Sequence, residues 1–170
     1  VHAGFDAHPG SLKAKFNVEG NRLMKGLCRT LGVKFRNNGS LVIAFNDEDM
    51  KTVRELYDRG VQNGVPDLQI LDKRAVHEIE PALAATVVGA LFAPTGGIVC
   101  PYGLTIAAAG NAMDNGAELC TNFEVTSIEK GDAYYTLNAA DGRSVQARFV
   151  VNSAGLFSDA IAAMVGDTSF

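Results

Sequence analysis

The sequence lacks the features that mark several broad classes of protein. None of its apolar runs approaches the roughly 20 residues that a membrane-spanning helix needs, so we expect no transmembrane segment. The formal net charge is −4 and no basic cluster appears, which argues against a nucleic-acid partner. The first residues have neither the positive start nor the apolar stretch of a signal peptide.

Cysteine is scarce, and its spacing argues against both disulfide bonds and a metal site. Cys28, Cys100 and Cys120 are an odd number of cysteines and lie far apart in the sequence. No Cys-x-x-Cys pair is present, and no spacing of histidine and cysteine fits a metal site. We therefore expect neither a disulfide framework nor a bound metal, and a reducing cytoplasm is the simpler location.

Common nucleotide-binding and nucleophile motifs are also absent. The chain has no Gly-x-Gly-x-x-Gly, no Gly-x-x-x-x-Gly-Lys-Ser/Thr and no Gly-x-Ser-x-Gly. Its 18 glycines are scattered, mostly at turns. A complete dinucleotide-binding domain is therefore not encoded here.

What the sequence does contain is an alternation of helix and strand signals around enough apolar residues to bury a core. Ser11, Asp47 and Asp72 are the predicted helix caps. The order of the elements indicates a mixed α/β (α+β) fold. The predicted helices are 12–31, 48–60, a short helix between Asp72 and Pro81, 102–115 and 160–165, and the predicted strands are 40–45, 68–71, 87–93, 118–129, 134–138 and 145–152.

The last turn of the chain has the most informative local pattern. Phe149–Asn152 predicts a buried strand that enters the small residues Ser153–Gly155, and Ser158 and Asp159 then open a short amphipathic segment. Small residues let a ligand approach the main chain, and the first N–H groups of a helix favour an anion. The turn therefore indicates a nucleotide phosphate site. A tight turn before a capped helix, with no ligand, explains the same residues.

Two other features each have a functional and an ordinary interpretation. Lys13 and Lys15 lie in the first turn of a predicted helix, where the helix dipole disfavours cations. An anionic ligand or partner would explain them, but exposed lysines are often uncompensated. His2-Ala3-Gly4 is likewise either a functional segment or a chance tripeptide.

Several short segments, taken in order, match one known family. The chain resembles the FAD-dependent oxidoreductases of the D-amino-acid-oxidase superfamily along essentially its whole length. The branch is that of the L-2-hydroxyglutarate dehydrogenases and oxidases, next to the glycerol-3-phosphate dehydrogenases. The matching segments are His2–Gly4, Pro9–Lys15, Asn38–Leu41, Gly60–Pro66, Glu80-Pro81, Thr95–Val99, Asn122–Val125 and Val151–Asp159.

The resemblance implies that the chain is an internal piece of a longer enzyme. In the family, a glycine-rich Rossmann turn precedes the His-x-Gly stretch at which this chain begins, and further strands follow. Residues 1–32 are then a flavin-proximal segment and helix, 33–100 part of a substrate-binding domain, and 101–170 a returning part of the Rossmann-like FAD-binding domain. The longer enzyme would bind FAD, whereas we expect this piece alone to be inactive.

The resemblance also implies roles for particular residues. His2 lies where relatives place a histidine beside flavin and substrate, which makes it the candidate catalytic base. His2 and Gly4 would lie near the flavin, and Val125 would hold the adenine through main-chain groups. Ala154 and Gly155 would approach the pyrophosphate, in agreement with the small residues of the last turn.

One departure from the family pattern bears on the substrate. Glycerol-3-phosphate dehydrogenases commonly have an arginine where this chain has Asp6, and an acid there would repel a phosphate. The expected substrate is therefore a small 2-hydroxy acid such as L-2-hydroxyglutarate, with glycerol 3-phosphate as the alternative. Lys13 and Tyr102 are candidate substrate contacts. A stand-alone binding module without redox activity is a further alternative, and the electron acceptor and any peripheral membrane contact stay open.

Overall fold

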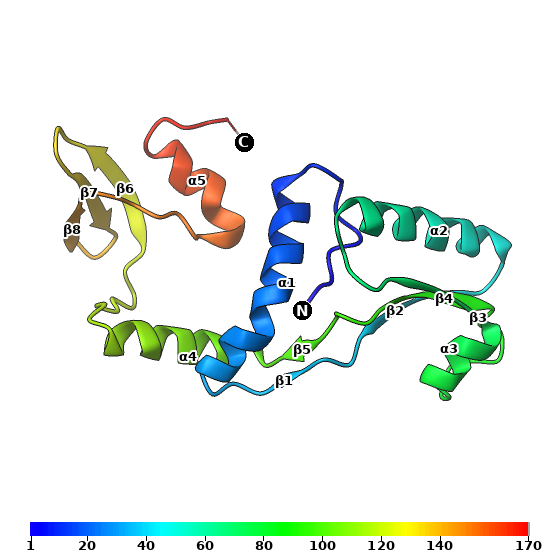
Figure 1. Cartoon of the computed structure of the whole chain (residues 1–170). Helices are drawn as coiled ribbons and strands as arrows, with labels where there is room; N and C mark the ends of the chain where they lie inside the picture. Colours follow the sequence, from blue (N-terminus) through cyan, green and yellow to red (C-terminus); the bar gives the residue numbers. More distant parts are fainter. Residues whose placement is uncertain (170) are drawn as a thin grey trace. The chain divides into compact units, whose positions relative to one another are not determined.

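The computed structural model describes residues 1–169, and the chain divides into two compact units (Figure 1). The units are Val1–Ala117 and Glu118–Phe170. The first contains α1 (Leu12–Thr30), β1 (Phe35–Arg36), β2 (Ser40–Ala44), α2 (Asp47–Gln62), β3 (Gln69–Asp72), α3 (Lys73–Ile79), β4 (Gly89–Ala93), β5 (Ile98–Val99) and α4 (Pro101–Asp114). The second contains β6 (Val125–Lys130), β7 (Tyr135–Ala139), β8 (Ser144–Ala147), the 3₁₀ turn η1 (Gly155–Phe157) and α5 (Ser158–Ala163). The mixed α/β class is confirmed.

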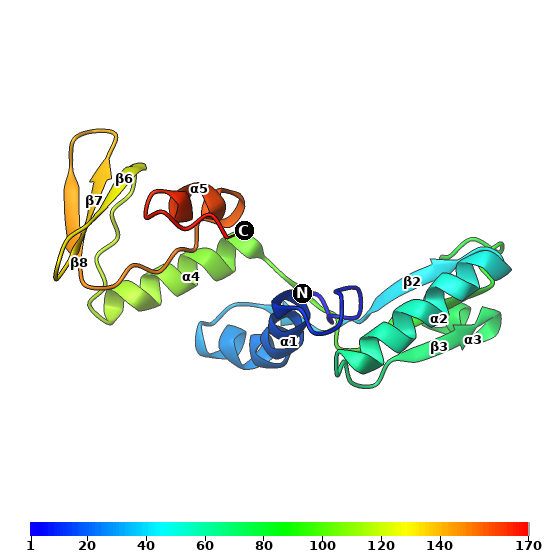
Figure 2. The same cartoon turned by 90° about the horizontal axis from the view of Figure 1, so that it is seen from above.

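The core of the first unit forms around an antiparallel sheet in the order β2-β4-β3. Side chains alternate between the faces of a strand, so neighbouring residues of β4 belong to different clusters. Leu91 is buried with Ala44 and Val53 on the face covered by α2. Ala90 is buried with Leu71, Val76 and Val87 on the face that α3 covers. Figures 1 and 2 show α2 lying along the sheet, with α3 on the other side.

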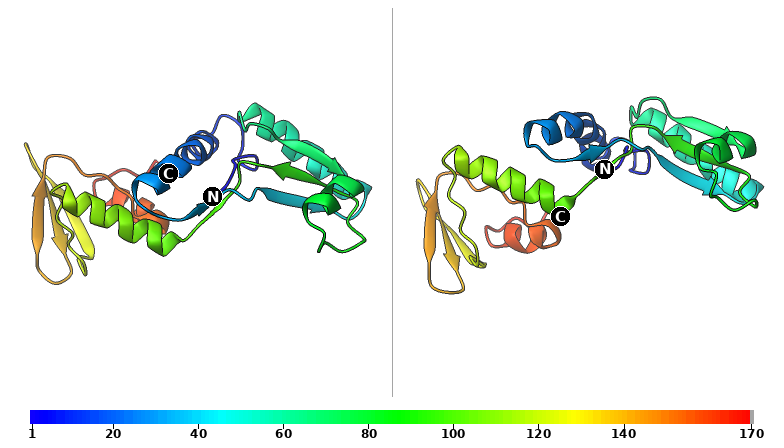
Figure 3. Two further views of the ribbon diagram at one scale, coloured as in Figure 1. Left: turned by 60° about the horizontal axis from the view of Figure 1, so that its bottom comes forward. Right: turned by 90° about the horizontal axis from the view of Figure 1, so that it is seen from below.

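A two-stranded antiparallel ribbon of β1 and β5 lies beside α1 (Figure 3). Phe35 pairs with Val99, and Arg36 pairs with Ile98. Neither strand was predicted from the sequence, because each has only two residues and exists only through the other.

Helix starts follow the local sequence closely, with one correction. The Ser11 hydroxyl accepts a hydrogen bond from Ala14 N at 3.1 Å, and the Asp72 carboxylate accepts one from Ala75 N at 2.8 Å, as predicted. The predicted cap at Asp47 is wrong, because α2 begins one residue earlier. Asn46 Oδ1 accepts from Asp49 N at 2.9 Å, and the Asp49 carboxylate accepts in return from Phe45 N.

The second unit is an antiparallel meander, β6-β7-β8, followed by η1 and α5. The first strand of this unit, β6, is shorter than predicted, because its pairing with β7 starts only at Val125. The prediction of a buried strand through 145–152 is wrong beyond Ala147. Phe149 and Val151 are 85% and 87% exposed, since no strand within the described residues pairs with them. An apolar run becomes a buried strand only where a neighbouring strand and a covering layer exist.

Candidate active site

A cavity of about 300 Å³ lies beside His2 in the first unit. Three stretches of chain line it. The N-terminal stretch contributes Val1–Ala3 and Phe5. Gly39 and the first three residues of β2 form a second part, and Gly97 with Ile98, the first residue of β5, forms the third. The imidazole of His2 is exposed, so it is accessible to a small molecule in this cavity.

The main chain around His2 is held in place by buried neighbours and by one asparagine. Ala3 is 2% exposed and packs with Val65 and Ala93. The side-chain amide of Asn21, on α1, donates to His2 O at 2.9 Å and to Thr95 O at 2.8 Å. The His2 segment is therefore joined to a loop that is distant in sequence, and its side chain projects from a fixed backbone.

That loop, Pro94–Gly97, is held from its other side by Asn37. The Asn37 amide donates to Pro94 O at 2.8 Å and to Gly96 O at 2.7 Å. Gly97 must be small here, because an added Cβ would lie 2.7 Å from the Phe35 ring and 2.8 Å from Arg36 O. The cavity wall thus depends on three residues, Asn21, Asn37 and Gly97, to which the sequence analysis gave no role.

Gly4 is needed for packing against α1. Its φ of +105° disfavours other residues, and a Cβ at this position would lie 2.9 Å from Val18 Cγ2. The Asn63 amide donates to Gly4 O at 2.9 Å and to Ala7 O at 2.8 Å, which fixes the turn that follows His2. Within the described residues, Gly4 is buried and does not line the cavity.

The other predicted substrate contacts are not brought to this cavity. Lys13 is exposed on the first turn of α1, and Tyr102 is 80% exposed on α4. Neither residue lines the cavity beside His2. Asp6 is also exposed and does not line this cavity.

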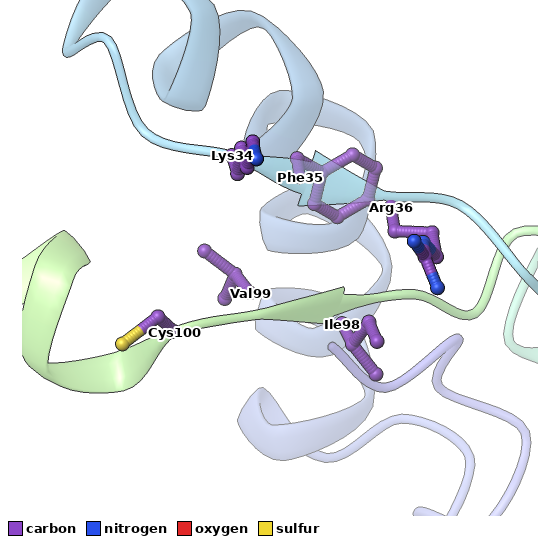
Figure 4. A pocket seen from close by; sticks show the side chains of 6 residues that line it. All are labelled: Lys34, Phe35, Arg36, Ile98, Val99 and Cys100. Carbon is purple, nitrogen blue, oxygen red and sulfur yellow. The ribbon is translucent and has the colours of Figure 1, made fainter.

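A second cavity, of about 530 Å³, lies at the β1–β5 ribbon (Figure 4). The alternation of Lys34 and Arg36 with an apolar residue was the available sequence signal for it, but no strand was predicted there. Ile98 lines this cavity and also the cavity beside His2. The lining residues are Lys34, Phe35, Arg36, Ile98, Val99 and Cys100.

The candidate phosphate turn lies in the second unit and is held by its own side chains. Asn152 Oδ1 accepts from Ala154 N at 3.2 Å, and Asn152 Nδ2 donates to Ser158 O at 2.7 Å. The Ser158 hydroxyl does not cap α5, because it donates to Gly155 O at 2.8 Å. Since α5 has only 6 residues and no side-chain cap, its dipole gives little support to an anion site.

Comparison with known proteins decides the family. Residues 1–169 match the family model described as DAO, FAD dependent oxidoreductase. The chain belongs to this family. The predicted resemblance, with its cofactor FAD, is confirmed at the level of the family.

The relatives of this chain include a glycerol 3-phosphate dehydrogenase and L-2-hydroxyglutarate dehydrogenases, the two kinds of enzyme that the resemblance implied. The chain is 47% identical over 167 residues to the glycerol 3-phosphate dehydrogenase of Caloramator mitchellensis, covering 98% of this chain and 35% of the relative. It is 31% identical over 166 residues to the L-2-hydroxyglutarate dehydrogenase of Escherichia coli (strain K12), covering 98% of this chain and 39% of the relative. The chain thus spans somewhat more than a third of the length of these proteins.

A solved structure supports membership of the same family. This chain is similar, with a TM-score of 0.85 and 28% identity, to the dithionite-reduced L-alpha-glycerophosphate oxidase from Mycoplasma pneumoniae with FAD bound. The match covers 96% of this chain and 44% of that one.

Two of the candidate FAD-binding residues, Gly155 and Val125, have main-chain groups that a nucleotide could reach. Gly155 has a φ of +60°, and a Cβ placed on it would meet nothing within 4 Å, so a ligand can approach the main chain there. Val125 begins the edge strand β6, whose outward main-chain groups lack ladder partners. Both residues therefore fit main-chain contacts to a nucleotide.

Two further features, a metal-binding cluster and a membrane-spanning helix, are absent from residues 1–169. No cluster of three or more histidine, cysteine or acidic side chains within that range could hold a metal ion. None of its helices combines the length and apolar character needed to cross a membrane.

Proposed function

We propose that this chain is part of an enzyme that oxidises the secondary alcohol of a small anionic substrate, with FAD as the hydride acceptor. The observation that carries the proposal is the accessible imidazole of His2 at the edge of a 300 Å³ cavity, in a chain of the FAD-dependent DAO family. FAD, when bound, takes up the hydride from the carbinol C–H bond. The substrate loses the hydroxyl proton at the same carbon and becomes a ketone.

His2 is the proposed acceptor of that proton. A histidine can hold or release a proton near neutral pH, and the main chain at this residue is fixed through Asn21. A fixed backbone with an accessible side chain is the arrangement that a general base needs. The neighbouring Phe5, Leu41 and Ile98 supply apolar walls to the cavity.

The proposed FAD contacts come from two stretches of the sequence. His2 and Gly4 belong to the flavin-proximal stretch, and Val125, Ala154 and Gly155 would contact the nucleotide part. The open main chain at Gly155 and the edge position of Val125 support the second group. Because the chain lacks the glycine-rich Rossmann turn, we expect it to bind FAD weakly and to be inactive when isolated.

Glycerol 3-phosphate is the first substrate candidate. The relative with that name is 47% identical to the chain. The expectation against a phosphate depended on Asp6, which does not line the cavity beside His2. L-2-hydroxyglutarate, which the sequence analysis favoured, is the second candidate and is supported by the relatives at 31% identity. Lys13 and Tyr102 stay predicted substrate contacts, and a cytoplasmic location stays a prediction.

Anaerobic reduction of the flavin tests the proposal without knowledge of the electron acceptor. The full-length protein is purified and mixed under argon with glycerol 3-phosphate or with L-2-hydroxyglutarate. Loss of the oxidised flavin absorbance with either compound supports the proposal, and the faster compound identifies the substrate. A full-length protein that contains no flavin would instead support the binding-module alternative, and a flavoprotein that neither compound reduces would overturn the proposed reaction.

A further inference from the structure

The cavity at the β1–β5 ribbon is lined in part by cationic side chains. Directly paired residues of an antiparallel ribbon project to the same side, so Arg36 and Ile98 share a face. Lys34 lies two residues before Arg36, just outside β1, and lines the same cavity. Phe35 and Val99 project to the other side of the ribbon, and they too border the cavity. Figure 4 shows the Arg36 side chain extending from β1 toward Ile98.

Neither cation is neutralised by a neighbouring acid. No ion pair within residues 1–169 involves Lys34 or Arg36, since the three pairs there join Lys51 to Glu48, Arg74 to Glu78 and Arg143 to Asp141. No acidic residue lines the cavity. In a chain with a net charge of −4, these two side chains create a local positive site. A guanidinium group can bind a carboxylate or a phosphate through two parallel hydrogen bonds.

Ile98 connects this positive site to the candidate active site. It lines the cavity that contains Arg36 and also the cavity that contains His2. The two cavities therefore border on the same side chain, and a small molecule that extends past Ile98 would present its charged end to one cavity and its hydroxyl group to the other.

We propose that Arg36 binds the anionic group of the substrate, with Lys34 adding positive charge beside it. The proposal rests on the proposed oxidation of an anionic alcohol. It names the residue that recognises the charge, and the same recognition applies to a phosphate and to a carboxylate. Arg36 is thus a binding residue, and His2 acts on the hydroxyl group.

The test uses the full-length protein with Arg36→Gln, Arg36→Lys and Lys34→Gln. Arg54→Gln, which removes an exposed cation from α2, is the matched control. Arg36→Gln is expected to raise KM for the anionic substrate about 10- to 100-fold, because a hydrogen-bonded charge is lost, while kcat changes little. Arg36→Lys recovers part of this loss, and Lys34→Gln has a smaller effect. Glycerol, which has no charge, is expected to react equally slowly with the wild type and with Arg36→Gln.

Direct binding separates this proposal from the proposed reaction. Inorganic phosphate and malonate are titrated calorimetrically into the same full-length proteins, without any turnover. We expect the Kd of at least one anion to rise about tenfold or more in Arg36→Gln and to be unchanged in Arg54→Gln. An unchanged KM and Kd in Arg36→Gln, or no binding of either anion to the wild type, would overturn the role of Arg36. Failure of the flavin reduction assay with intact anion binding would overturn the reaction alone.

Discussion

The side chain of Asn21 holds Thr95 and His2 together, although Asn21 and Thr95 are separated by 74 positions in the sequence. One amide group donates to the main-chain oxygens of both residues. The candidate base and the loop that forms the cavity wall therefore share a single anchor on α1. This relationship leads to a stability prediction and supports a catalytic one.

Replacing Asn21 by alanine is expected to destabilise the first unit by about 1–2 kcal/mol, because two hydrogen bonds are lost. Asn111→Ala is the matched control. It lies within α4, and the structure shows no hydrogen bond from its side chain. Both changes gain the same helix propensity, so their difference isolates the two bonds. Urea unfolding followed by circular dichroism measures it, and equal midpoints for the two variants would contradict the anchoring role.

Replacing His2 by asparagine in the full-length protein is expected to lower the rate of flavin reduction about 10²- to 10⁴-fold, the usual contribution of a general base. His8→Asn is the control, because His8 is exposed and lies outside the cavity lining. Stopped-flow absorbance under anaerobic conditions measures the rate. A His2 variant that reduces flavin at the wild-type rate would exclude His2 as the base.

Gly97→Ala is expected to destabilise the first unit by about 1–3 kcal/mol through overpacking. The new methyl group would lie 2.7 Å from the Phe35 ring and 2.8 Å from a main-chain oxygen, which cannot move away easily. Gly26→Ala is the opposite case, since it lies in α1 with nothing within 4 Å. That change is expected to stabilise the chain by about 0.5–1 kcal/mol. Thermal unfolding of the two variants checks the predicted difference in sign.

The turn between β7 and β8 is expected to lose stability in acid. Hydrogen bonds from the main chain and then the side chain of Arg143 hold the pKa of Asp141 below its ordinary value of 3.8. The folded state thus favours the charged carboxylate. This contribution is complete above the ordinary pKa and disappears as the pH falls through the lower, folded value. Arg143 also donates to Asn122 O at 2.6 Å, so the loss reaches the segment before β6.

Amide hydrogen exchange of β7 and β8 between about pH 5 and pH 2 follows this change directly. Intrinsic exchange rates at each pH are used to convert the measured rates into protection. Asp141→Asn is expected to reduce the acid-dependent loss of protection in these strands. Asp132→Asn removes a carboxylate from the other turn of the meander and is the control. An acid response that is identical in the wild type and in Asp141→Asn would rule out this linkage.

Local sequence chemistry predicted the helices well and the strands less well. Ser11 and Asp72 cap their helices as expected, since a cap depends only on residues within one turn. The error at Asp47 was a shift of one residue, because Asn46 is an equally good cap. The sequence predicted a strand at Phe149–Asn152, but pairing depends on a distant neighbour, and these residues stay exposed.

Some residues of the candidate site were predicted from the sequence, and others were found only in the structure. The sequence predicted His2, Gly4, Val125, Ala154 and Gly155 through a family pattern. The family is confirmed, and the roles of these residues stay predictions. The sequence contained no signal for the bridge made by Asn21, for the tight packing at Gly97 or for the ribbon that holds Arg36. Each of these depends on segments that are far apart in the chain.

The sequence by itself determined the α/β class, the helix caps at Ser11 and Asp72 and membership of the DAO family, because these depend on local residue patterns and their order. Only the tertiary structure decided which side chains border the His2 cavity, that Asp6 is not among them, and that Ile98 borders both this cavity and the one at Arg36. Those outcomes come from pairing and packing between distant segments, and no local pattern encodes them.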